Sequence, residues 1–205
     1  MADVSSASAV DGMFDEIGSR YGRLDVLVNN AGVSGPTAPV EEIAPADWDR
    51  TVAVDLNGQF YCTRRAVPML KAAGGGSIIL ISSSAAFFGY PLRTPYTACK
   101  WALIGFMKTL AMEVGPYGIR VNAICPGSVR GARIDGVIER DAAKRGRSAA
   151  DIRRLYERQT SLRSFVAAED VANAACFLAS GQGAMISGQA IGVDGHTESL
   201  SNWLD

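Results

Sequence analysis

The sequence has 205 residues, of which 48% are hydrophobic, and a formal net charge of −1. This length allows one domain with a sizeable core, and the balanced charge gives no support to a nucleic-acid or membrane partner. Neither a signal peptide nor an apolar run near the ~20 residues of a membrane span is present, so we expect a cytoplasmic protein. The scattered cysteines Cys62, Cys99, Cys125 and Cys176 form no Cys-x-x-Cys pair, and we expect buried thiols without a metal site.

The first half of the chain alternates between helical and strand-like patterns. Residues 8–21 have apolar positions at helical spacing, and residues 24–28 form a short apolar run typical of a buried strand, followed by Asn29-Asn30-Ala31-Gly32. Residues 45–70 again follow a helical pattern, in which Gly58 and Pro68 are points where the helix can bend. This alternation predicts an α/β fold.

A second strand and a helix follow. Residues 74–76 are three glycines that precede an apolar run, and this order favours a plain turn over a phosphate-binding loop, which would follow a strand. Residues 77–81 are apolar and β-branched, as in a strand buried on both faces, and three serines come directly after them.

The next helix brings a phenol and an ammonium group together. Thr94-Pro95 is a helix-start signal with Thr94 as the expected N-cap, and the pattern continues to Gly115-Pro116. Tyr96 and Lys100 are four residues apart and therefore share one helix face. A phenol ordinarily ionises near pH ~10, and a neighbouring cation and a helix N-terminus both favour its charged form. This pair therefore indicates general acid–base chemistry.

A third strand is expected over residues 119–125, followed by Pro126-Gly127-Ser128-Val129. Three apolar strands thus end in small or polar residues, and ligands in open α/β sheets bind beyond those carboxyl ends. An amphipathic helix over residues 166–178 and a last strand within residues 186–195 complete the pattern.

The segment from Arg130 to Arg163 is basic, with a local net charge of +5. Two interpretations stay open. The segment binds an anionic substrate, or it is a solvated helical surface crossed by ion pairs.

Ser83, Tyr96 and Lys100, the last two in Tyr-x-x-x-Lys spacing, resemble the catalytic signature of the short-chain dehydrogenase/reductase family. Asn29-Asn30-Ala31-Gly32 before the signature and Pro126-Gly127 after it stand in the family's order, so the resemblance covers nearly the whole chain. It implies one Rossmann-like, doubly wound domain over residues 1–205 with a mostly parallel sheet, and a helical substrate lid at about 130–165. It also implies an oxidoreductase that interconverts an alcohol and a ketone with NAD or NADP.

The resemblance assigns roles to individual residues. Tyr96 is the proton donor or acceptor, Ser83 polarises the substrate oxygen, and Lys100 supports Tyr96 and binds the nicotinamide ribose. Asn29 braces the sheet, whereas Ala31 and Gly32 leave room for the cofactor's ribose. Pro126, Gly127 and Val129 flank the nicotinamide. The helices that contain Phe60 and Phe106 pack against a partner subunit in a homodimer or homotetramer, or are covered within the chain.

The sequence departs from the family's pattern at three places. Asp55 replaces an asparagine of the catalytic set, and it either takes over that role or is a helix-capping or solvated aspartate. Gly131 replaces a threonine that contacts the carboxamide, which puts that contact in doubt. His196, the one histidine, follows the last strand, and substrate contact is one reading of it.

No glycine-rich loop between a strand and a helix precedes Asn29, and the resemblance makes Asp3-Val4 the end of a strand whose aspartate meets the adenine ring. The fold therefore looks N-terminally truncated, with the strand at residues 24–28 left as an uncovered edge. The alternative function is a non-catalytic remnant that acts at most as an assembly partner. The choice between NAD and NADP, and the substrate itself, do not follow from these residues.

Overall fold

The computed structural model describes residues 1–199 and contains a parallel four-stranded sheet in the order β1-β2-β3-β4. The strands are β1 (Val26–Asn29), β2 (Gly76–Ile81), β3 (Ile119–Pro126) and β4 (Ala190–Val193). The helices are α1 (Ala7–Tyr21), α2 (Pro45–Val52), α3 (Gly58–Ala72), α4 (Thr94–Val114), α5 (Ala132–Arg145), α6 (Ala149–Arg158) and α7 (Ala168–Ala179).

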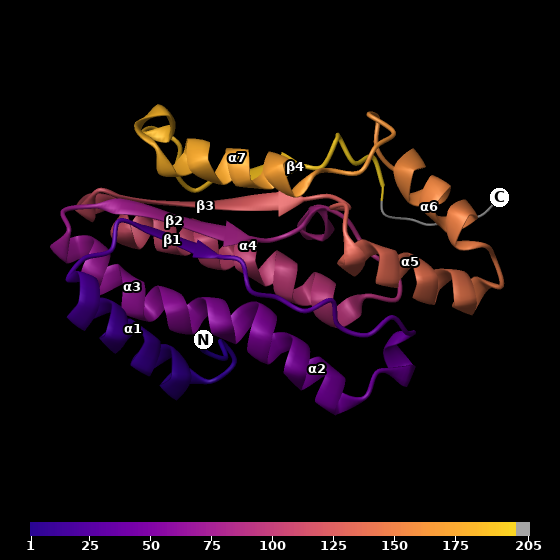
Figure 1. The fold of residues 1–205 in the computed structure, drawn as a ribbon, viewed down its shortest axis with the longest axis horizontal. Coiled ribbons are helices and arrows are strands. Elements are labelled where there is room, and N and C mark those ends of the chain that lie inside the picture. Colours follow the sequence, from indigo (N-terminus) through magenta and orange to yellow (C-terminus); the bar gives the residue numbers. More distant parts are fainter. Residues whose placement is uncertain (200–205) are drawn as a thin grey trace.

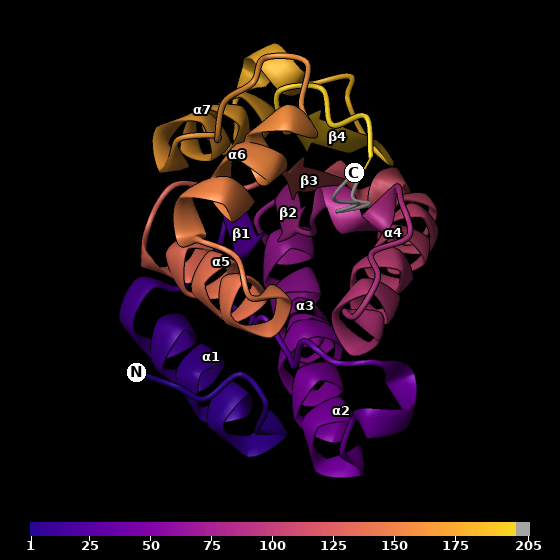
Figure 2. The same cartoon turned by 90° about the vertical axis from the view of Figure 1, so that its right-hand side faces the viewer.

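Helices cover both faces of the sheet. Figure 1 shows α1, α3 and α4 on one side and α7 on the other, and the view in Figure 2 separates the same layers. Helices α5 and α6 lie beyond the carboxyl ends of the strands. The predicted doubly wound, Rossmann-like α/β fold is confirmed.

The core is split between the two faces of the sheet. Ile78 and Leu80 of β2 pack into a cluster with α1, α3 and α4, whereas Ile79 between them packs with Leu178 of α7. Side chains alternate between the faces of a strand, so a strand covered on both sides needs an uninterrupted apolar run. This requirement explains the run at the centre of β2.

The edge strand β1 differs from the prediction. It runs from Val26 to Asn29, one to two residues later than expected, and it is only partly buried, since Val26 is 36% and Val28 46% exposed while Asn29 is buried. Leu27 packs against the cluster on the α3 side. In the described part of the chain, β1 pairs with β2, and α7 packs mainly over β2, β3 and β4, so the face of β1 opposite α3 has little helical cover. Among the described strands β1 pairs with β2 alone, so the uncovered edge expected from the sequence is present.

The helix predicted over residues 45–70 is divided. Between α2 and α3 the backbone forms a wider π-helical turn, Ala53–Asn57, and Gly58 then begins α3. Such turns occur frequently at functional sites. This one contains Asp55.

The predicted strand end at Asp3-Val4 is wrong, because these residues form a turn before α1. The exposed Asp3 carboxylate accepts hydrogen bonds from the backbone N–H and the hydroxyl of Ser5, which lower the pKa of Asp3. The cofactor contact proposed for Asp3 stays a prediction. No helix in the described part of the chain is both long and apolar enough to cross a bilayer. Residues 1–199 also contain no cluster of His, Cys, Asp or Glu suited to a metal ion.

Candidate active site

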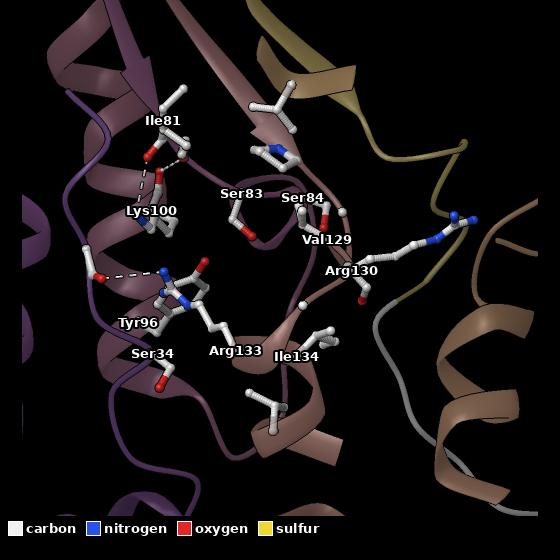
Figure 3. A pocket seen from close by; sticks show the side chains of 18 of the residues that line it. Ser34, Ile81, Ser83, Ser84, Tyr96, Lys100, Val129, Arg130, Arg133 and Ile134 are labelled. Atoms are coloured by element: carbon white, nitrogen blue, oxygen red, sulfur yellow. Dashed lines mark hydrogen bonds between the residues drawn. The ribbon is translucent and has the colours of Figure 1, made fainter. Parts of the chain in front are cut away.

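A cavity of about 450 Å³ opens at the carboxyl ends of β2 and β3. Its wall comes from four parts of the chain: the loop after β1, the ends of β2 and β3 with the segments that follow them, the first turns of α4, and the helices α5 to α7. Figure 3 shows this cavity from close by. Its position agrees with the sequence prediction, since ligands of open α/β sheets bind beyond these strand ends.

Tyr96 and Lys100 reach the cavity from the start of α4. Thr94 is the first helical residue and not the N-cap. Arg93 takes the N-cap position, one residue earlier than predicted, and its side chain makes no capping hydrogen bond to the helix. The Lys100 Nζ lies 5.3 Å from the centroid of the Tyr96 ring, and Lys100 is only 4% exposed. The rigid helix therefore holds the phenol and the ammonium group on one face, as their spacing predicts.

Ser83 points into the same cavity from the end of β2 (Figure 3). Its hydroxyl oxygen accepts a hydrogen bond from the backbone N–H of Ala85 at 3.1 Å, which orients the side chain. The neighbouring Ser82 is buried and donates to the Lys100 carbonyl oxygen at 3.0 Å, so it ties the strand end to α4. The hydroxyl, the phenol and the ammonium group are thus brought together, as predicted from the sequence.

Asp55 lies behind Lys100 and is fully buried. Its Oδ2 is 3.4 Å from the Lys100 Nζ, and its Oδ1 accepts a hydrogen bond from the Val33 backbone N–H at 2.7 Å. The Lys100 Nζ also donates to the Ile81 carbonyl oxygen at 3.3 Å. The reading of Asp55 as a helix-capping or solvated aspartate is therefore wrong, because its partners are a buried cation and the loop after β1.

The predicted residues after β1 divide into two groups. Asn29 is buried and donates to the Gln59 carbonyl oxygen and the Thr63 hydroxyl, so it braces β1 against α3 and does not line the cavity. Ala31 is exposed and also lies outside the cavity wall, whereas Gly32 is part of it. A Cβ at Gly32 would lie 3.4 Å from the Asp55 Oδ1 and 3.6 Å from the Lys100 Nζ, so a side chain there would crowd the ion pair.

The segment after β3 forms the opposite wall. Pro126, Gly127 and Val129 all line the cavity, as expected, and so does Gly131. Gly131 sits at the start of α5 with φ 135°, a backbone conformation that favours glycine. His196 is exposed, lies 3.1 Å from the Ser161 hydroxyl through Nδ1, and is not part of the wall.

The basic segment proves to be mixed. Several of its arginines form ion pairs within α5 and α6, such as Arg145 with Asp141 at 2.6 Å and Arg153 with Asp135. This pattern fits the solvated surface crossed by ion pairs. Arg130 and Arg133, however, line the cavity.

The helices α5 and α6 are held to the cavity by a hydrogen-bonded pair of tyrosines. Tyr90, in the loop after β2, lies 3.2 Å from Tyr156 of α6 between hydroxyl oxygens, and the Tyr156 hydroxyl donates to Asp141 at 3.5 Å. Burial raises the pKa of both phenols, so both are protonated at neutral pH.

Sequence reasoning missed Asn30, Tyr90, Arg93 and Tyr156 as residues of the cavity wall. Two of them had a local signal: Arg93 precedes Tyr96 by three residues, about one helical turn, and Asn30 directly follows the strand that ends at Asn29. Tyr90 and Tyr156 reach the cavity through tertiary packing.

The thiols are not all buried, because Cys176 of α7 is exposed. Burial, with a smaller contribution from Asp55, raises the pKa of Cys99 to about 11, and burial raises the pKa of Cys125 to about 11 as well. Burial also raises the pKa of Cys62. At pH 8 only ~0.1% of the Cys99 and Cys125 thiols would be the reactive thiolate.

We therefore expect one fast-reacting thiol per native chain when the protein is titrated with Ellman's reagent at pH 8. The Cys176→Ser variant should lose this fast phase, whereas unfolding in guanidinium should expose all the remaining thiols. A second fast thiol in the native wild-type chain would contradict the burial of Cys62, Cys99 and Cys125.

Known proteins resemble this chain over most of its length. A family model described as enoyl-(acyl carrier protein) reductase matches residues 1–196. D-β-hydroxybutyrate dehydrogenase of Rhizobium meliloti is 34% identical over 195 residues, which cover 95% of this chain and 75% of that protein. Trans-4-hydroxycyclohexanecarboxylate dehydrogenase of Sinomonas cyclohexanicum is 40% identical over 176 residues, which cover 86% of this chain and 61% of that protein.

Solved structures agree in fold. A crystal structure of NAD⁺-bound xylitol dehydrogenase has a TM-score of 0.89 at 26% identity, covering 94% of this chain and 76% of its own. The crystal structure of sorbitol-6-phosphate 2-dehydrogenase SrlD from Erwinia amylovora has a TM-score of 0.90 at 28% identity. The match covers 95% of this chain and 76% of that protein.

Proposed function

Because the chain belongs to the short-chain dehydrogenase/reductase family, we propose that it interconverts an alcohol and a ketone with NAD or NADP and uses Tyr96 as general acid or base. The chain is an oxidoreductase of this family. The observation that carries the proposal is the convergence of Ser83, Tyr96 and Lys100 on one cavity at the ends of β2 and β3.

Each side chain has a distinct task in this proposal. The Tyr96 hydroxyl gives a proton to the carbonyl oxygen during reduction, and the deprotonated Tyr96 oxygen takes one from the alcohol during oxidation. The Ser83 hydroxyl donates a hydrogen bond to the same oxygen. The Lys100 ammonium, 5.3 Å from the Tyr96 ring centroid, stabilises negative charge that develops on the phenol oxygen. Asp55 holds Lys100 in place through their buried ion pair.

The cavity wall fits the nicotinamide half of a dinucleotide. The backbone at Gly32 carries no side chain and lies next to the Lys100 ammonium in the same cavity wall as Tyr96, which suits the ribose hydroxyl groups. Pro126, Gly127 and Val129 would form a largely apolar surface for the ring. The bound nicotinamide would supply or accept the hydride.

The surroundings of the cavity suggest a lid and an assembly. We propose that α5 and α6, which pack together around Ile138 and Ile152, act as a substrate lid on a single domain. We also propose a homodimer or homotetramer, because Phe60 of α3 and Trp101 of α4 are 48% and 51% exposed. Phe106 packs against the core instead.

Nucleotide binding tests the proposed function directly. Titration with NADH and NADPH should produce saturable energy transfer from Trp48 or Trp101 for at least one nucleotide, and secondary alcohols should then change the nicotinamide absorbance. The Lys100→Ala variant should bind the nucleotide ~10-fold more weakly, as expected for the loss of a charge-assisted hydrogen bond.

The matched control is Lys108→Ala on the exposed side of the same helix, which should bind normally. Wild-type protein that binds neither nucleotide and transfers no hydride would overturn the proposal in favour of the non-catalytic alternative.

A further inference from the structure

The cavity wall is strongly cationic. Among the described residues, the side chains that line it include Arg93, Lys100, Arg130 and Arg133 but no aspartate or glutamate. Asp55 pairs with Lys100 behind the wall. Arg130 extends away from Tyr96 and Lys100 in Figure 3 and donates to the Ser164 hydroxyl at 2.9 Å. Since Lys100 is paired with Asp55 and Arg130 points away, Arg93 and Arg133 are the two cations of the wall that remain available to a bound ligand.

Arg93 is a buried cation without a counter-charge. It is 4% exposed, its Nη2 donates to the Ser34 carbonyl oxygen at 2.5 Å, and its Nε is buried without a hydrogen-bond partner. No carboxylate in residues 1–199 lies within ion-pair distance of its guanidinium. A buried charge is costly unless it is paired, and one carbonyl oxygen offsets only part of that cost. An anion bound in the cavity would supply the missing partner.

Arg93 lies close to Tyr96, so an anion bound by Arg93 would lie near the reacting group of the substrate. Its guanidinium carbon lies 5.1 Å from the centroid of the Tyr96 ring and 5.3 Å from that of Tyr90. Arg133 adds a second cation at the start of α5, where its Nη1 donates to the Gly32 carbonyl oxygen at 3.4 Å, and it lines the same cavity as Tyr96. A charged group only a few bonds from the reacting carbon would therefore reach Arg93.

We propose that Arg93, assisted by Arg133, forms a carboxylate subsite and that the substrates are hydroxy acids and the corresponding keto acids. The planar guanidinium fork matches a carboxylate, and the cavity of about 450 Å³ admits a small acid. The inference rests on the proposed function, since it makes Arg93 a specificity determinant for that reaction.

The test compares an acid with its uncharged counterpart. Calorimetry with 3-hydroxybutyrate and with 3-hydroxybutanamide should show at least ~10-fold tighter binding of the acid by the wild-type chain, the size expected for a charge-assisted contact. Arg93→Gln should weaken the acid by ~10- to 100-fold and leave the amide nearly unchanged, whereas Arg93→Lys should restore part of the difference. The matched control is Arg140→Gln, an exposed arginine of α5 that lies outside the cavity wall, and this variant should change neither ligand.

Several results would overturn the subsite. One is equal binding of acid and amide by the wild-type chain, which needs no variant and holds even where Arg93→Gln fails to fold. A second is equal weakening of both ligands in Arg93→Gln, the result of a purely structural role. A third is tighter Arg93-dependent binding of glycerol 3-phosphate than of the acid, which would make the site a phosphate site. Arg93-dependent binding of the acid without hydride transfer to any alcohol or ketone would sustain the subsite and refute the proposed function instead.

Discussion

Replacing Tyr96 with phenylalanine should lower turnover by ~10³-fold, the middle of the range for loss of a positioned general acid or base. The substitution removes one oxygen from a side chain that α4 holds in place, so the cavity keeps its shape. Nucleotide affinity should stay within a factor of about three, because Lys100, Gly32 and the segment after β3 remain. The measurement is steady-state turnover together with an NADH or NADPH titration of the same preparation.

The control for this substitution is Tyr117→Phe. Tyr117 is exposed near the end of α4 and lies outside the cavity wall, so its loss should leave turnover unchanged. A Tyr96→Phe variant that retains more than about a tenth of wild-type turnover would rule out Tyr96 as the proton donor.

Replacing Asp55 with alanine should lower the free energy of unfolding by about 3 kcal/mol. The substitution leaves the Lys100 ammonium, 4% exposed, without its carboxylate and the Val33 N–H without its acceptor. This value is at the low end for breaking a buried ion pair, because Lys100 also faces the cavity. Urea denaturation followed by circular dichroism measures the change.

Two further variants separate the contributions. Asp55→Asn keeps an oxygen for the Val33 N–H but still leaves Lys100 without a carboxylate, so it should lose about 2 kcal/mol. Asp25→Asn removes one partner of an exposed pair with Arg23, where the side chains are 59% and 64% exposed, and should leave the urea midpoint nearly unchanged. If Asp55→Ala were no more destabilising than Asp25→Asn, the buried pair would contribute nothing to stability.

Local patterns predicted the elements of the site well. The run in β2 has the β-branched, uninterrupted character that burial on both faces requires, and the i, i+4 spacing places Tyr96 and Lys100 on one face of α4. The less accurate predictions concern positions where neighbours decide. Val26 and Val28 are exposed, against the burial expected for residues 24–28, because α7 packs mainly over the other strands of the described sheet. The exposure of Cys176 depends on where α7 meets that sheet.

The role of Asp55 did not follow from the resemblance to the family. Comparison with the family marked it as a departure, but its sequence neighbourhood fits a solvated or capping aspartate equally well. Its pairing with Lys100 depends on the π-helical turn and on the packing of that turn against α4, which spacing along the chain does not encode.

By itself, the sequence determined the order of strands and helices, the place of the cavity at the strand ends, and the three side chains that meet there, because helical and strand periodicities act over only a few residues. Only the tertiary structure decided which charges are neutralised. Lys100 pairs with Asp55, which lies 45 positions earlier in the sequence, whereas Arg93 forms no ion pair with a carboxylate among the described residues. Charge pairing depends on distances of a few ångströms between segments far apart in the chain, and those distances exist only once the layers have packed.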